Sequence, residues 1–151
     1  MEISAMIISI VALILSLLQF IFNSNREKNE STLVAYNELL NEVFSKLNTI
    51  FIFYDNDFPD FEENGEYWED LTTYLAKIED KIDRFCVGIN THIYSINILN
   101  RLGGGYFIRI FETLKPVINK KRTKNISKGK HYDEFEKTVT KLRKKRSLIQ
   151  K

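Results

Sequence analysis

The amino-acid sequence predicts an all-α protein, in which an N-terminal transmembrane helix continues into a small cytoplasmic helical bundle. Two features carry this prediction. One is an uncharged apolar run near the N-terminus, and the other is the recurrence of apolar residues at steps of three and four along most of the remaining chain. Proline occurs only twice, and the alternation of β-branched and polar residues that is typical of strands is absent from the sequence.

The first element is the apolar run Ile3–Phe22, which contains no charged residue. At about 1.5 Å per residue it forms a helix of about 30 Å, the thickness of the hydrocarbon core of a bilayer. A cleaved signal peptide is disfavoured, because a basic leader and a small-x-small cleavage site are both missing. A buried core helix is disfavoured because the run is apolar on every face. We therefore expect a retained membrane anchor.

The flanks of the apolar run predict its orientation. Arg26 and Lys28 follow the run, whereas no lysine or arginine precedes it. Basic residues favour the cytoplasmic side, so we expect the N-terminus outside and the C-terminal domain in the cytoplasm. The single cysteine, Cys86, is compatible with a reducing compartment. The sequence therefore predicts a single-pass protein of the cell (inner) membrane.

Small or polar residues recur on one face of the apolar run. They follow a four-three-four-three spacing and are Ala5, Ser9, Ala12, Ser16 and Gln19. Small side chains let two helices approach closely in lipid, and serine and glutamine can hydrogen-bond across the contact. We therefore predict an oligomer face. The alternative is that these residues are merely tolerated, with their hydroxyls bonded to the preceding turn of the same helix.

A second helical pattern runs from Glu30 to Tyr54 and contains a heptad of leucines, Leu33, Leu40 and Leu47, which we assign to the same oligomer face. No proline or glycine separates this pattern from the span, so one continuous helix is expected. Two interpretations stay open: a parallel homo-oligomer with a coiled-coil stalk, or an amphipathic helix that folds back on its own domain. The apolar face is wider than a heptad seam, which favours folding back for part of the helix.

Residues 55–70 form an acidic segment with eight carboxylates and no lysine or arginine. Calcium binding is one interpretation of this segment. However, the spacing of a twelve-residue calcium loop is missing, and Phe58, Pro59 and Phe61 interrupt the acidic residues. An acidic turn that caps the next helix is favoured, because carboxylates in a first turn interact well with the helix dipole.

Further apolar stripes predict three more helices in the domain and a basic helix after it. Their expected ranges are residues 67–90, 96–102, 106–119 and 132 onward. Three consecutive glycines, Gly103–Gly105, are expected to end the second of these helices and to form a bend. The expected organisation is a transmembrane anchor (1–25), a helical cytoplasmic domain (26–122) and a basic C-terminal helix (123–151).

The sequence contains no motif for catalysis or for binding a cofactor or a metal. The three glycines lack the lysine and the serine or threonine of a phosphate-binding loop. Glu79, Asp80 and Asp83 are interleaved with basic residues, as on a salt-bridged surface. The two histidines stand far apart without further ligands at metal spacing, and no nucleophile can be paired with a base. We therefore expect no enzyme activity, no metal and no cofactor.

Charge is distributed unevenly along the chain. Residues 1–114 contain 8 basic and 17 acidic residues, whereas residues 115–151 contain 14 basic and 3 acidic residues, and the net charge of +2 hides this difference. A basic tail held near a membrane is expected to meet anionic lipid. The predicted contacts with lipid or another polyanion are Arg26, Lys28, Lys120, Lys121, Arg122, Arg143, Lys144, Lys145 and Arg146.

Three alternatives to lipid are open for the basic tail. One is the acidic segment 55–70, within one chain or between chains. Another is nucleic acid, which is disfavoured because few aromatic residues are available for stacking on bases. The third is a solvated basic helix without a partner.

A central block of the sequence contains Ile78-Glu79-Asp80, Phe85 to Asn90, Ile93-Tyr94, Asn100 to Gly104, Ile108-Arg109, Glu112 and Leu114 to Ile118. Through these residues the chain resembles a bacterial family of uncharacterised single-span membrane proteins with a small helical domain of unknown function. The resemblance implies an N-terminal anchor followed by a helical domain, and it implies no particular chemistry.

We expect a structural, scaffolding or regulatory protein that is anchored in the membrane by one span and that self-associates through its N-terminal helix. The alternative is a membrane-perturbing or signal-sensing effector, for instance in bacterial antiviral defence. Its support is the small polar face of the span, together with a compact domain suited to sensing a signal.

Overall fold

The structure describes residues 2–47, 66–124 and 132–149 of this computed structural model, and nearly all of them are helical. The elements are α1 (Glu2–Leu39), a π-helical turn η1 (Leu40–Phe44), α3 (Glu66–Asn90), α4 (Ile96–Lys124) and α5 (Asp133–Ile149). These segments contain no strand, so the all-α prediction is confirmed for them. The acidic residues 55–65 and the end of the predicted helix, 48–54, lie outside the described residues.

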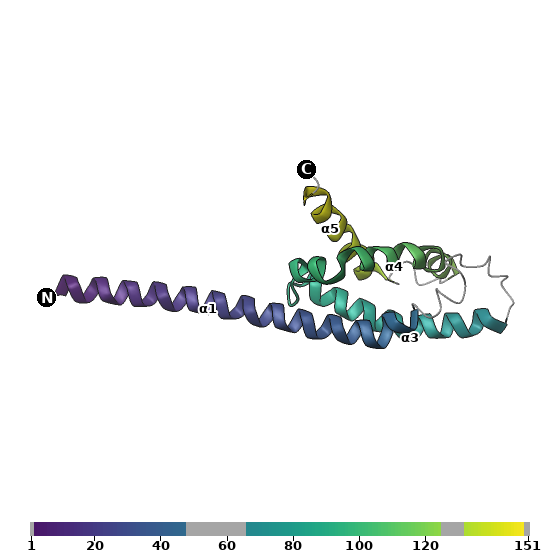
Figure 1. Ribbon diagram of the computed structural model, residues 1–151, viewed down its shortest axis with the longest axis horizontal. Helices are drawn as coiled ribbons and strands as arrows, with labels where there is room; N and C mark the ends of the chain where they lie inside the picture. The colour runs from purple at the N-terminus through teal and green to yellow at the C-terminus, as the bar shows by residue number, and fades with distance from the viewer. Residues whose placement is uncertain (1, 48–65, 125–131, 150–151) are drawn as a thin grey trace.

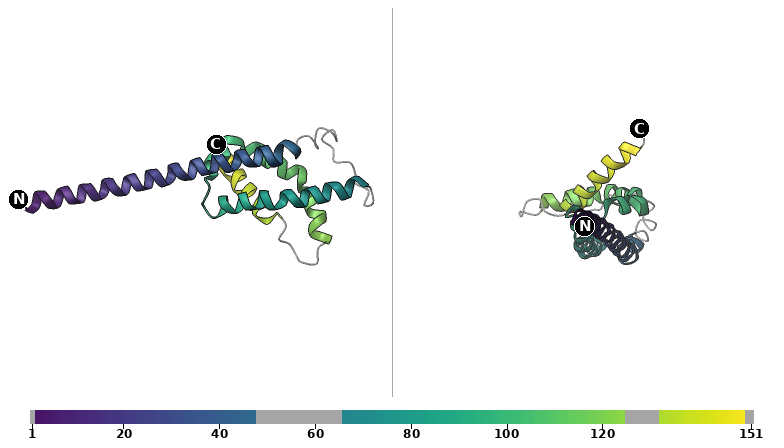
Figure 2. Two further views of the ribbon diagram at one scale, coloured as in Figure 1. Left: turned by 90° about the horizontal axis from the view of Figure 1, so that it is seen from below. Right: turned by 90° about the vertical axis from the view of Figure 1, so that its left-hand side faces the viewer.

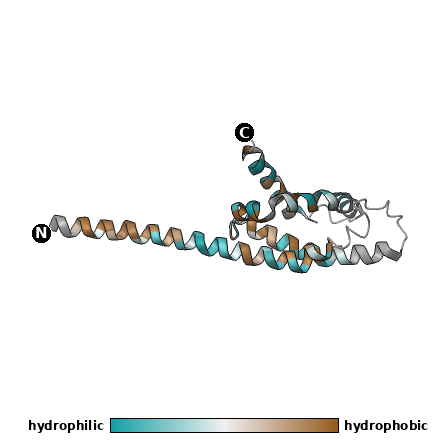
Figure 3. Cartoon of the chain, viewed as in Figure 1, coloured by the Kyte–Doolittle hydropathy of each residue, from teal (hydrophilic) through white to brown (hydrophobic). Residues whose placement is uncertain are grey.

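Helix α1 is an unbroken rod that continues through η1 into a further α-helical turn at residues 45–47. Figure 1 shows that its N-terminal half extends beyond every other element. Its hydropathy changes along the rod, from an apolar N-terminal half through a polar band to a mixed C-terminal part (Figure 3). The continuous helix expected between the apolar run and the domain is therefore confirmed.

The C-terminal part of α1 packs with α3, α4 and α5 into one bundle. Helix α3 runs antiparallel to α1, and α4 then returns in the direction of α1 (Figures 1 and 2). Helix α5 packs against both α3 and α4. The basic C-terminal helix therefore shares the hydrophobic core of the domain.

Phe107 of α4 lies at the centre of the core and contacts rings from three other elements. The centroid of its ring is 5.8 Å from that of Phe44 in η1, 6.0 Å from Phe85 in α3 and 4.9 Å from Phe135 in α5. All four side chains are buried. Edge-to-face aromatic pairs contribute about 0.5–1.5 kcal/mol each beyond the burial of their area, so this cluster fixes how the four elements cross.

Helix α4 is kinked at Gly103, where the backbone angles are φ −174° and ψ 31°. The bend expected at the glycines is therefore present. The two helices expected on either side of it, 96–102 and 106–119, are parts of one element that continues past Pro116 to Lys124. Gly103 also lacks room for a side chain, because the hydroxyl of the buried Tyr36 occupies the space that a Cβ atom would take.

A tight turn at residues 91–95 joins α3 to α4, as the sequence predicts. The backbone N–H of Tyr94 donates to the carbonyl oxygen of Gly88 (2.8 Å), and its ring stacks on Phe85 with centroids 5.5 Å apart. His92 adopts φ 66°, a left-handed conformation that reverses the chain. The turn closes the end of the bundle from which the N-terminal half of α1 projects (Figure 1).

Candidate functional site

The N-terminal half of α1 exposes a continuous apolar surface. Large apolar side chains between Met6 and Phe22 are 49–71% exposed, and the most apolar window of this helix has a mean hydropathy of 2.4 with none of it buried. A buried core helix is therefore excluded for this stretch. Among the described residues, one helix is long and apolar enough to cross a membrane. Monomeric soluble proteins rarely expose such a large apolar surface.

On the small-residue face of α1, the hydroxyl of Ser16 has a hydrogen-bond partner within its own helix. The hydroxyl of Ser16 donates to the carbonyl oxygen of Ala12 (2.9 Å), which is the bond to the preceding turn that the sequence left as an alternative. Ser9, Ala12, Ser16 and Gln19 are exposed, and the side chain of Ala5 lies outside the described set. Close approach of a second helix to this face thus leaves the Ser16 hydroxyl bonded.

The bundle covers only one side of α1, opposite the small-residue face. The buried side chains of α1 are Thr32, Tyr36 and Leu39. They follow Ser16 by 16, 20 and 23 residues, which at 3.6 residues per turn places them about 140–200° around the helix. Val34 follows Ser16 by 18 residues, about five whole turns, and is 66% exposed. The small-residue face therefore continues along the uncovered side of the rod.

The three leucines of the predicted heptad do not all lie on the uncovered side of α1. A straight α-helix drifts by about 20° per heptad against a seven-residue repeat, so Leu33, Leu40 and Leu47 rotate progressively away from the small-residue face. Leu33 is exposed, Leu40 packs partly against the core, and Leu47 is 0% exposed within it. Leu47 therefore packs within its own domain, as the fold-back interpretation predicts. Its assignment to an oligomer face is wrong, because the side chain is buried in the core.

Thr32 joins the projecting rod to the bundle. Its fully buried hydroxyl accepts a hydrogen bond from the backbone N–H of Ser95 (2.7 Å) and donates one to the carbonyl oxygen of Lys28 (2.6 Å). The α3–α4 turn is thus attached to α1 ten residues after the apolar stretch ends at Phe22. Sequence reasoning missed this joint, because a single threonine beside Leu33 gives no periodic signal.

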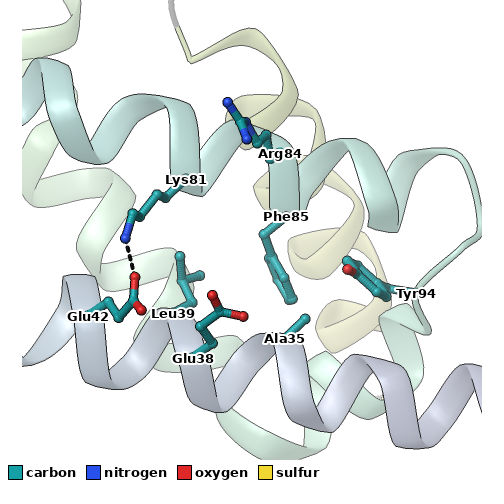
Figure 4. A pocket seen from close by; sticks show the side chains of 8 residues that line it. All are labelled: Ala35, Glu38, Leu39, Glu42, Lys81, Arg84, Phe85 and Tyr94. Carbon is teal, nitrogen blue, oxygen red and sulfur yellow. Dashed lines mark hydrogen bonds and ion pairs between the residues drawn. The ribbon is translucent and has the colours of Figure 1, made fainter.

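A shallow groove of about 280 Å³ lies between α1 and α3 (Figure 4). Apolar side chains of Leu39 and Phe85 line it, and charged residues from both helices stand at its edges. Lys81 and Glu42 form an ion pair across it, and this hydrogen bond lowers the pKa of the Glu42 carboxyl. Arg84 instead pairs with Asp80 on its own helix (2.6 Å). No group of histidine, cysteine or acidic side chains in the described part of the chain is suited to hold a metal.

Two of the predicted lipid contacts, Arg122 and Arg143, form ion pairs between α4 and α5. Arg122 is only 22% exposed in its side chain and pairs with Asp133 (3.0 Å) and Glu136 (2.9 Å), so it links α4 to α5. Arg143 pairs with Glu112 of α4. Both guanidinium groups therefore link α5 to α4, and their contact with lipid or another polyanion stays a prediction.

The other predicted contacts differ in their surroundings. Arg26 is exposed and pairs with Glu30 one turn later (2.8 Å), whereas Lys28 is half-buried. At the end of α5, Lys144 and Arg146 are exposed and Lys145 is half-buried. The side chains of Lys120 and Lys121 lie outside the described set.

A half-buried carboxylate sits where α5 begins. The carboxylate of Asp83 in α3 accepts a hydrogen bond from the backbone N–H of Phe135 (3.3 Å). Burial, opposed by this bond, raises the pKa of Asp83 to about 6, with Glu79 and Glu134 adding to the increase. Burial also raises the pKa of the adjacent Cys86 thiol well above its usual value, which suits a structural cysteine.

The described residues thus form an all-α protein with one helix long and apolar enough to cross a membrane. Residues 6–142 match a family described as a domain of unknown function, DUF4760, and the chain belongs to that family. The match begins inside the exposed apolar stretch, includes the joint at Thr32 and ends at Leu142, before the last turns of α5. No curated protein and no solved structure matches the chain.

Proposed function

We propose that this protein is a single-pass membrane protein with a structural, scaffolding or regulatory role and no catalytic one. In this proposal α1 crosses the cell membrane with its N-terminus outside and holds the helical domain in the cytoplasm. The observation that carries the proposal is that a single uninterrupted helix is apolar and uncovered in its N-terminal half and part of the domain core in its C-terminal half. Such a helix transmits its own position and rotation directly to the domain.

The second part of the proposal is self-association through α1. Small residues line one face of the apolar stretch, and Val34 continues this face on the side that the bundle leaves free. Two copies can therefore bring their rods together in parallel without a clash between their domains on the opposite side. Leu33 borders this face, whereas Leu40 and Leu47 are engaged in the core.

Cysteine crosslinking in native membranes tests the interface. Ser9→Cys and Ser16→Cys lie on the proposed face, and Ile7→Cys and Ile14→Cys are matched controls about 180° away on the helix. Cys86 is 0% exposed and does not contribute to crosslinking. We expect disulfide-linked dimers from the first two variants only. Equal crosslinking on both faces, or none on either, would overturn self-association.

The orientation is tested with a membrane-impermeant maleimide and the variant Ser147→Cys, whose position is exposed at the end of α5. We expect no labelling in intact cells and full labelling in inverted membrane vesicles. Labelling in intact cells would place the domain outside and refute the proposed topology.

A second candidate function is favoured by the polar groups of Ser9, Ser16 and Gln19 on one face of an otherwise apolar stretch. Assembled copies that turn these groups toward one another would create a polar path, as expected of a membrane-perturbing effector. Induced expression with a membrane-potential dye separates the two functions. Depolarisation that Gln19→Leu abolishes would support the effector, and an unchanged potential would leave the scaffold.

A further inference from the structure

Three segments of the chain meet at the end of the bundle that faces the apolar half of α1. The α3–α4 turn is attached there through the hydrogen bond between Ser95 and Thr32, and the first turns of α4 follow directly. Helix α5 reaches the same end, because the guanidinium of Arg146 donates to the side-chain oxygen of Asn100 in α4 (3.2 Å). Figure 1 shows the C-terminal end of α5 on this side. We call residues 91–102 and 143–149 the span-side end.

The span-side end is basic. Arg101, Lys144 and Arg146 are exposed there, and Lys145 is half-buried. The sequence of α5 contains no acidic residue after Glu136, and Arg143 is already paired with Glu112. The part of α1 nearest to this end carries two basic and two acidic residues, Arg26, Glu27, Lys28 and Glu30, whose charges cancel.

The same end also exposes apolar side chains. Ile93 in the turn is 62% exposed, Leu102 in α4 is 41% exposed, and Leu148 near the end of α5 is 68% exposed. Single exposed apolar residues are common on protein surfaces. Apolar side chains among basic ones are, however, the pattern of elements that lie at a membrane surface, where the former enter the headgroup layer and the latter bind its anions.

The length of α1 places this end within reach of the bilayer. Thr32 follows Phe22 by ten residues, which is about 15 Å of helix. The headgroup layer occupies about 5–7 Å of that distance, and the Debye length under physiological conditions is about 8 Å. Transmembrane helices tilt by about 20° on average, and a tilt toward α5 brings its C-terminal end closer to the bilayer.

We propose that the span-side end docks on anionic lipid headgroups of the membrane that α1 crosses. This inference rests on the proposed function, because it requires α1 to be the span. The occupant is lipid because the surface is held beside a bilayer by its own chain and combines positive charge with exposed apolar side chains. Docking would fix the tilt of α1 and the height of the domain.

The test uses the full chain in vesicles, with a fluorophore on Ser147→Cys and a quencher attached to a fraction of the lipid headgroups. Vesicles of phosphatidylcholine alone are compared with vesicles of equal parts phosphatidylcholine and phosphatidylglycerol. We expect stronger quenching in the anionic vesicles and loss of the difference at 1 M salt, where the Debye length falls to about 3 Å.

Charge removal at two ends of the domain supplies the matched control. Arg101→Gln/Lys144→Gln/Arg146→Gln should lower the ratio of docked to free domain on the order of 100-fold and return quenching to the phosphatidylcholine level. Lys46→Gln/Lys77→Gln/Lys115→Gln removes three positive charges at exposed positions farther from the span and should leave quenching unchanged. Equal quenching in both vesicle types, or equal effects of the two triple variants, would overturn the proposal.

A third variant tests the apolar contacts, and an extraction step separates the two levels of inference. Ile93→Ser/Leu148→Ser should reduce quenching in anionic vesicles while all charges are kept, and unchanged quenching would refute a role for these side chains.

Alkaline carbonate removes proteins that do not span the bilayer. Loss of the chain into the wash would refute the span itself, whereas retention with equal quenching would refute docking alone.

Discussion

At the scale of single residues, Thr32 carries the joint between the rod and the bundle. Thr32→Val keeps the shape and the β-branching of the side chain but removes both hydrogen bonds. The buried N–H of Ser95 then has no acceptor, and we expect the free energy of unfolding to fall by about 1–3 kcal/mol. Unfolding of the full chain in detergent, followed by circular dichroism, measures this loss.

Thr32→Ser is the control for this substitution, since its hydroxyl can make the same two bonds. It should retain most of the stability and lose only the contribution of one buried methyl group. If valine were tolerated as well as serine, the hydrogen bond to the α3–α4 turn would contribute nothing to the joint.

The raised pKa of Asp83 predicts that the stability of the fold increases as the pH falls below neutrality. Its pKa is about 6 in the folded protein and about 3.9 in an unfolded chain, so the folded state binds the proton more tightly. Between these two values stability must rise as the pH falls, because the folded state holds more protons than the unfolded state. We expect the melting temperature to increase when the pH is lowered from 7.5 to 5.

Other carboxyl groups act in a lower pH range and in the opposite direction. Hydrogen bonds from Lys81 and Lys137 lower the pKa of Glu42 and of Glu134, so the stability from these groups is lost only as the pH falls below about 4.5. Asp83→Asn should therefore flatten the profile between pH 5 and 7.5. A rise that persists in this variant would show that another group causes it.

At the scale of elements, alanine substitutions at two glycines of α4 should change the stability of the fold in opposite directions. A Cβ at Gly103 overlaps the hydroxyl of the buried Tyr36, whereas a Cβ at the exposed Gly105 comes no closer than 3.4 Å to the flexible side chain of Arg146. We expect Gly103→Ala to destabilise the fold by about 1–3 kcal/mol through overpacking. Gly105→Ala should stabilise it by up to about 1 kcal/mol, because alanine favours a helix.

The melting temperatures of the two alanine variants test this difference directly. Two losses of equal size would mean that both glycines are required for helix α4 as a whole. Two gains would mean that the kink at Gly103 is not needed and that the ring of Tyr36 can move.

The helices themselves were predictable, because apolar residues at steps of three and four mark a buried face wherever the chain lies. The sequence was less informative about which face of each helix is buried. The buried stripe of α1 includes Thr32 and Leu39, whereas the heptad pattern selected the neighbouring Leu33 and Leu40. Both stripes are apolar enough to form a face, and only the positions of α3 and α4 decide which one is covered.

The candidate site shows the same division between composition and geometry. The sequence predicted the exposed apolar stretch, because this stretch is long and contains no charged residue. The engagement of Arg122 and Arg143 did not, because their partners lie on other helices or across the segment 125–131 from them in the chain. Asp83 reads as one charge among many on a salt-bridged helix, and only the start of α5 above it makes it a half-buried cap.

At the scale of the whole molecule, an unbroken α1 makes the rotation of the domain depend on the rotation of the apolar N-terminal half of α1. In the proposed dimer Val34→Cys should form a disulfide in membranes, since Val34 lies about five whole turns after Ser16 on the uncovered side. One alanine inserted after Asn25 turns the domain by about 100° relative to the small-residue face. We expect this insertion to abolish crosslinking at Val34 and to preserve crosslinking of Ser16→Cys within the apolar stretch.

Seven residues inserted at the same place provide the matched control. They add about two turns, so Val34 returns to within about 20° of its original direction and its crosslinking should recover, although the domain moves about 10 Å along the rod. Crosslinking at Val34 that is indifferent to both insertions would show that the polar part of α1 bends or swivels. In that case the span would tether the domain without orienting it, and a signal could not pass along the helix as a rotation.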